Sequence, residues 1–99
     1  MNCQERILRI LEQIAGTELA TGVSNKHLSD QFGVPPSTIS HDLLVLESMS
    51  WIERTPARGW WRVTKEYVFT ANRAIRKYME YQEWVQGNNE RRRREGGKQ

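Results

Sequence analysis

Residues 25–49 read NKHLSDQFGVPPSTISHDLLVLESM and decide the fold. This stretch holds two helical patterns that are separated by only Gly33, Val34 and Pro35. Glycine adopts the left-handed conformation that ends a helix, and proline suits the first helical position because its missing amide donor would be unpaired there anyway. A connection this short forces the two helices to cross steeply. The second helix is then pushed outward, with its polar side free to face a partner.

The second helix of this pair, expected from Pro36 to about Met49, has two chemically different sides. An apolar stripe with spacing i, i+4, i+7 and i+10 must face a core, and it consists of Ile39, Leu43, Leu46 and Met49. The opposite side carries Ser37, Ser40, His41 and Leu44. Hydroxyl groups at the helix start, that of Thr38 included, can bond phosphates or base edges, although they also serve as helix caps. His41 can donate to guanine, or pair with phosphate when it is protonated.

Helices are also expected on both sides of this pair. The first runs over about Cys3 to Ala15. From about Lys65, apolar residues recur alternately three and four apart, which predicts a further helix that ends at Gly87. The remainder, 87–99, is polar and rich in arginine and is predicted to be disordered.

A β-hairpin follows the helix pair. Residues 51–53 and 60–63 form the strands, and Gly59 lies in the turn between them. Residues two apart on a strand share a face, so Trp60 and Trp61 point in opposite directions, and we expect Trp61 inside.

Basic residues in and beside the hairpin are candidate phosphate or minor-groove contacts. They are Arg54, Arg58 and Arg62, and Trp60 on the outer face would lie near the backbone or the bases. Lys26 opens the helix at 25–32, where amide donors and its charge could bind a phosphate; a solvated lysine is the alternative.

The order of these elements predicts a mainly α fold with a small β-hairpin. It is a winged helix-turn-helix, with a three-helix core plus wing, followed by an additional C-terminal helix. We expect a winged helix-turn-helix domain at 1–64, a C-terminal helix at 65–86 for packing or dimerisation, and a disordered basic tail at 87–99.

Four segments carry a family resemblance: HLSDQFGVPPST at 27–38, STISHDLLVLE at 37–47, SWIER at 50–54 and GWWRV at 59–63. Together they resemble bacterial winged-helix regulators, most closely the DNA-binding domain of the IclR family, over residues 5 to about 64. The resemblance implies a recognition helix followed by a wing. Members usually carry a second, ligand-binding domain, and we expect no effector domain here because the chain has no room for one.

Two positions depart from the family pattern. His41 stands where an arginine is common in the recognition helix, and neutral imidazole lacks the permanent charge and the bidentate fork of arginine. Ser50 stands where a glycine is common. A serine in the left-handed conformation costs about 1 kcal/mol relative to glycine.

The net charge of +3 is unevenly distributed along the chain. Residues 1–53 carry −4 and residues 54–77 carry +6, while residues 78–85 carry −2 and residues 86–99 carry +3. A polyanion would therefore meet the middle of the chain and the tail. The arginine run at 91–94 fits a solvated tail, a phosphate clamp or RNA binding.

Composition argues against several classes of protein. No apolar run approaches the roughly 20 residues that span a bilayer, and the N-terminus lacks a secretory signal, so a cytoplasmic location is expected. Cys3 is the only cysteine, and His27 and His41 lie on different helices. We therefore expect no enzyme, no cofactor and no metal site.

Two features leave the partners open. Leu44 and Val45 fall off the core stripe, so they either pack on the hairpin or the last helix, or meet thymine methyl groups or a protein. The stripe of the last helix either packs on the first helix or forms a homodimer seam, which would suit a palindromic operator.

The sequence thus predicts a DNA-binding protein, a small transcriptional regulator of bacterial or phage type. It would read duplex DNA with the helix at about 36–49 and clamp the backbone with the wing at about 54–62. The candidate DNA-binding residues are Lys26, Pro36, Ser37, Thr38, Ser40, His41, Arg54, Arg58, Trp60 and Arg62. The alternative is a winged-helix protein-protein interaction module without sequence-specific DNA binding.

Overall fold

The computed structural model describes the backbone of residues 1–97 and the side chains of residues 1–89. The chain divides into two compact units, Met1–Val68 and Phe69–Gln99. The first unit holds almost all of the predicted elements. Within residues 1–97, no helix combines the length and the apolar character that a bilayer crossing requires.

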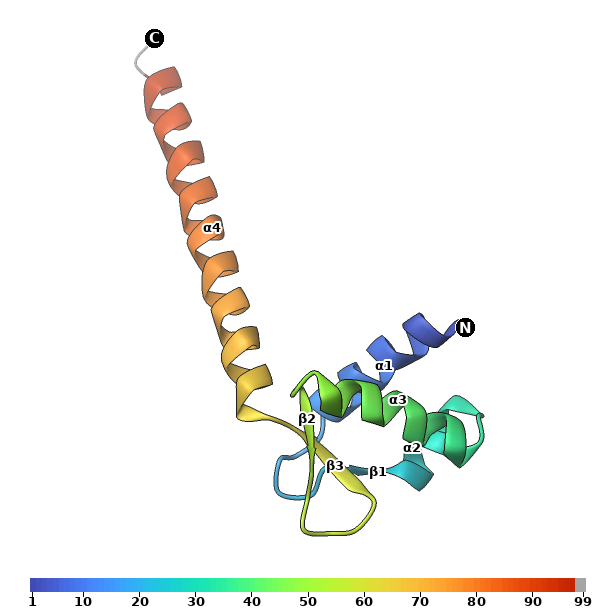
Figure 1. Cartoon of the computed structure of the whole chain (residues 1–99). Coiled ribbons are helices and arrows are strands. Elements are labelled where there is room, and N and C mark those ends of the chain that lie inside the picture. The colour runs from blue at the N-terminus through green and yellow to red at the C-terminus, as the bar shows by residue number, and fades with distance from the viewer. Residues whose placement is uncertain (98–99) are drawn as a thin grey trace. The chain divides into compact units, whose positions relative to one another are not determined.

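The first unit contains three helices and a small antiparallel sheet (Figure 1). In chain order they are α1 (Cys3–Ala15), β1 (Val23–Ser24), α2 (Asn25–Phe32), α3 (Pro36–Ser48), β2 (Ile52–Arg54) and β3 (Trp60–Val63). The predicted fold class, a mainly α winged helix-turn-helix followed by a C-terminal helix, is confirmed. The sheet has the order β1-β3-β2. Strand β1 was not expected, because two residues are too few to show alternation.

The helix ends follow the local sequence signals. Asn2 Oδ1 accepts a hydrogen bond from the Glu5 amide at 2.7 Å and begins α1. Ser24 Oγ accepts one from the His27 amide at 3.1 Å and begins α2. Gly33 ends α2 with a φ of 65°, in the left-handed region. The tight connection predicted between α2 and α3 is therefore present.

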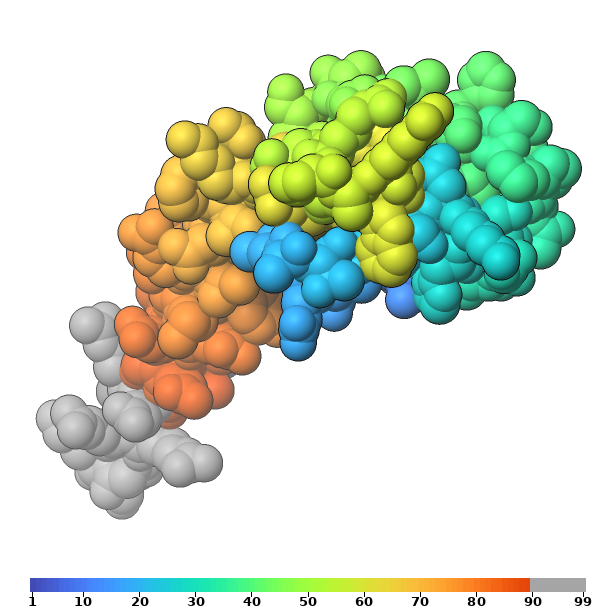
Figure 2. Space-filling model, turned by 90° about the horizontal axis from the view of Figure 1, so that it is seen from below, coloured from blue at the N-terminus to red at the C-terminus, as the bar shows by residue number. Residues whose placement is uncertain are grey.

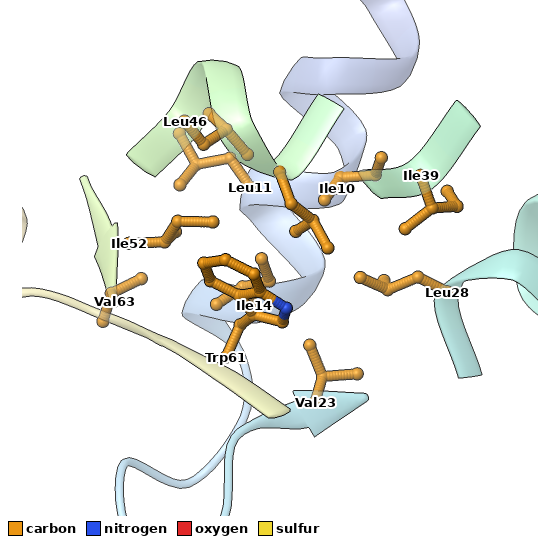
Figure 3. Close-up of a cluster of buried hydrophobic side chains, with 11 residues drawn as sticks. Ile10, Leu11, Ile14, Val23, Leu28, Ile39, Leu46, Ile52, Trp61 and Val63 are labelled. Carbon is orange, nitrogen blue, oxygen red and sulfur yellow. The ribbon is translucent and has the colours of Figure 1, made fainter. Parts of the chain in front are cut away.

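A single apolar core lies between the helices and the sheet (Figure 3). Its buried members are Ile10, Leu11, Ile14, Val23, Leu28, Ile39, Leu43, Leu46, Ile52, Trp61 and Val63. Trp61 is 5% exposed and Trp60 is 36% exposed, so the predicted inward and outward tryptophans are confirmed. Gly22 packs so closely on β3 that a Cβ there would overlap the carbonyl oxygen of Trp61.

Ile39, Leu43 and Leu46 of α3 are buried in the core, as predicted, but the prediction that Met49 is buried with them is wrong. Met49 is 50% exposed, because α3 ends at Ser48 and the chain turns away from the helix direction. Trp51 packs on the core instead, and its ring lies 5.9 Å from that of Tyr67.

Helix α4 (Lys65–Gly97) begins where the sequence predicts and continues beyond the predicted end at Gly87. One glycine inside a helix costs only about 1 kcal/mol relative to alanine, so it does not have to end the helix. The predicted disorder of 87–99 falls largely on residues whose side chains lie outside the described part of the chain.

Ser50 has a φ of 61° and is the one non-glycine residue with a positive φ in the described chain. Its side chain is exposed, and its backbone makes hydrogen bonds that glycine would keep. We therefore expect Ser50→Gly to raise the free energy of unfolding by about 1 kcal/mol, measured by urea denaturation. Ser48→Gly, inside α3, should lower it. A neutral or destabilising Ser50→Gly would contradict the strain assigned to this turn.

Candidate nucleic-acid interface

The outward side of α3 carries the predicted polar residues. Ser37 and His41 are exposed, and Thr38 and Ser40 are half-buried. Pro36 occupies the first turn, and the N-cap, Pro35, offers no side-chain acceptor to the amide donors there. Pro36 has no N–H, and the Thr38 amide donates to the Pro35 carbonyl at 3.0 Å, so this helix start offers an anion the Ser37 amide and the helix dipole.

An ion pair between α1 and α3 holds α3 in this orientation. The Arg6 guanidinium binds Asp42 through Nε to Oδ2 at 2.5 Å and through Nη2 to Oδ1 at 3.2 Å. This hydrogen bonding raises the pKa of Arg6 above its ordinary value. The Asp42 side chain is 4% exposed, so the pair restrains rotation of α3 about its own axis.

Sequence reasoning missed this pair, although a signal for it exists. Asp42 stands four residues before Leu46, and Arg6 four residues before Ile10. Both positions therefore flank an apolar stripe that packs into the core. Opposite charges at the edges of two such stripes indicate a pair across the helix contact.

A cleft of about 220 Å³ lies beside α3, between that helix, the start of α2 and the hairpin. Figure 2 shows these three segments next to one another on one face of the first unit, α3 in green, the start of α2 in cyan and the hairpin in yellow-green. The cleft is lined by Asn25, Ser40, Leu44, Arg54, Arg58, Gly59 and Trp61. It brings three predicted contact residues, Ser40, Arg54 and Arg58, into one site.

Asn25 lines the cleft and connects its parts, and sequence reasoning missed it. Its Oδ1 accepts a hydrogen bond from Trp61 Nε1 at 2.6 Å, and its Nδ2 donates to Ser40 Oγ at 3.3 Å. Ser40 is thus held by the protein, and its own hydroxyl proton remains available to an outside acceptor.

The charge around the cleft is positive. Arg54 lies over the Trp61 ring, 4.8 Å from its centroid, and pairs with Glu47 at 3.4 Å. Both acidic residues of α3, Asp42 and Glu47, are therefore engaged by arginines. Arg58 is exposed at the hairpin turn and makes no ion pair within the described part of the chain.

The strand register separates the other hairpin candidates from this cleft. Arg54 is paired with Trp61, and Glu53 with Arg62, so Arg62 lies on the outer face of the sheet. Arg62 is half-buried and meets Glu53 at 3.6 Å, and Trp60 shares that face. Lys26 is exposed at the start of α2, one residue from the cleft.

Leu44 and Val45 remain on the surface, 49% and 44% exposed. Leu44 lines the cleft between α3 and the hairpin, and Val45 is exposed next to it in the sequence. Two exposed apolar residues thus adjoin the polar side of α3.

Among the described residues, no three His, Cys, Asp or Glu side chains gather where they could hold a metal ion. His27 and His41 are exposed on different helices, and Cys3 lies at the start of α1.

The three-helix core, the tight connection from α2 to α3 and the hairpin behind them define a winged helix-turn-helix protein. The IclR helix-turn-helix domain matches residues 5–56, just over half of the chain, and the chain belongs to this family of DNA-binding transcription regulators. The predicted resemblance is confirmed. No curated protein and no solved structure shows a significant match to the chain.

Proposed function

We propose that this chain is a small transcription regulator that reads duplex DNA with α3 and holds the DNA backbone with the hairpin at about 54–62. One observation carries the proposal: the polar side of α3 and the arginine-lined cleft lie on the same face, and the acidic residues of α3 are already paired. A polyanion meets no uncompensated α3 carboxylate there.

The dimensions of α3 suit the major groove. A helix of 13 residues is about 20 Å long, and a major groove about 12 Å wide admits it. In helix-turn-helix proteins the first residues of the recognition helix contact base edges. Ser37, Thr38 and His41 occupy those positions here, and Pro36 and Ser40 flank them.

The remaining candidates contact the backbone in this proposal. Arg58 binds a phosphate on one side of α3, Arg54 contributes its charge at the same cleft while it stays paired with Glu47, and Lys26 binds a phosphate from α2. Trp60 and Arg62, on the outer face of the sheet, contact the DNA only along the edge of the hairpin. We expect the protein to act in the cytoplasm, where its DNA target lies.

A protein-interaction role is the second candidate, and the exposed Leu44 and Val45 favour it. Salt distinguishes the two roles. Phosphate binding falls steeply as salt rises because counterions are released, whereas an apolar protein contact changes little.

The DNA-binding proposal predicts different effects for His41 and Arg58. His41→Ala should relax the preference at one base position, by roughly 1 kcal/mol, because it removes a contact to a base edge. Arg58→Ala should weaken binding to all sequences alike and reduce the salt slope by about 1. Selection of bound duplexes from a random DNA pool, followed by binding titrations at several salt concentrations, measures both effects.

Arg9→Ala is the matched control, because it removes an exposed arginine from α1, where Arg9 pairs with Glu12. It should leave both affinity and base preference unchanged. An equal loss of affinity from Arg9→Ala and from Arg58→Ala would show that the protein attracts DNA only through its general charge. The absence of any selected sequence would favour the protein-interaction role.

We also propose that α4 forms a homodimer with a second copy of the chain. In helical projection, one side of residues 68–86 carries no charged residue, while Arg73, Arg76, Lys77, Glu80 and Glu83 lie on the other. The uncharged side includes Ile75 and Tyr78, which are 56% and 62% exposed. Exposed apolar residues at this spacing fit a two-helix seam.

Dimerisation is tested by sedimentation equilibrium. Ile75→Glu should weaken the dimer at least about tenfold, equivalent to about 1.4 kcal/mol, because a carboxylate would be buried in the seam. The control Arg76→Glu lies on the charged side and should have a small effect. A chain that is monomeric at micromolar concentration, or equal effects of the two substitutions, would exclude this seam.

A further inference from the structure

We infer that Asn25 is a positioning residue that sets the gap between α3 and the hairpin. This inference rests on the proposed DNA-binding function, because that gap decides whether the helix and the hairpin can engage one duplex together. Asn25 itself contributes no charge and need not touch DNA.

Asn25 makes three hydrogen bonds to three different parts of the site. Its backbone amide donates to the Gly59 carbonyl, in the hairpin turn, at 3.0 Å. Its side chain accepts from the Trp61 indole on β3 at 2.6 Å and donates to the Ser40 hydroxyl on α3 at 3.3 Å. One half-buried residue therefore links the turn and the strand of the hairpin to α3.

The link to Trp61 is the strongest of these constraints. Trp61 is 5% exposed, and without Asn25 its buried indole N–H would be left unpaired. The bond to Asn25 therefore fixes the indole as well as the amide. Because Arg54 lies over the same ring, the orientation of Trp61 also places one of the arginines that line the cleft.

Asn25→Ala keeps the backbone bond to Gly59 and removes both side-chain bonds. The hairpin would then remain attached to α2 but lose its fixed separation from α3. A matched control is Ser24→Ala, which removes the N-cap bond of the same helix and lowers its stability while leaving both side-chain bonds of Asn25 in place.

The gap is measured without DNA by double electron-electron resonance between spin labels at His41→Cys and Arg58→Cys, in a Cys3→Ser background. The labelled chain is diluted in excess unlabelled chain, so that only distances within one chain contribute. We expect a narrow distance distribution in the parent, a broadened and shifted one with Asn25→Ala, and the parent distribution with Ser24→Ala. An unchanged distribution with Asn25→Ala, or equal broadening in both variants, would overturn the positioning role.

A second arm uses DNA binding. If Asn25 positions the hairpin, Arg58→Ala should cost less affinity in the Asn25→Ala background than in the parent, whereas with Ser24→Ala the two losses should add. Additive losses with Asn25→Ala would also overturn the inference. If the parent binds no duplex, the proposed function fails, and the distance measurement still decides the role of Asn25.

Discussion

Burial of one side of α3 is the constraint on which the rest of the molecule depends. Ile39, Leu43 and Leu46 are at most 1% exposed, so the helix has a single rotational setting in which its apolar stripe is covered. The ion pair between Asp42 and Arg6 closes the edge of that stripe. The hydroxyl and imidazole groups on the opposite side are consequently presented to the solvent.

The site has two parts, the exposed side of α3 and the hairpin beside it. Trp61 contributes its ring to the core and its indole N–H to Asn25, so a single side chain serves both stability and the geometry of the cleft. Arg54 and Arg58 line the same cleft as Trp61. At this surface, where a polyanion would approach, they offset the negative charge of residues 1–53. Local charge, rather than the net charge of the protein, therefore governs its partners.

Periodicity and turn residues were sufficient to predict the fold. The alternation that puts Trp60 and Trp61 on opposite faces depends only on neighbours in the sequence, as does the connection through Gly33. The site was less accessible: Asp42 pairs with Arg6, and Asn25 with Trp61, each across 36 residues. The positions of Asp42 and Arg6 beside two apolar stripes give a signal for the first pair, whereas no local pattern reveals the second. Met49 failed as a core residue because the end of a helix is set by the turn that follows it.

The most direct test of the central claim is to map DNA contact on the chain by amide NMR shifts during titration with a selected duplex. The account predicts that the largest shifts fall at 25–27, 36–41 and 54–59, and that added salt reverses them. Shifts confined to residues beyond 86, or spread over α1 while α3 is unaffected, would contradict a DNA interface formed by α3 and the hairpin.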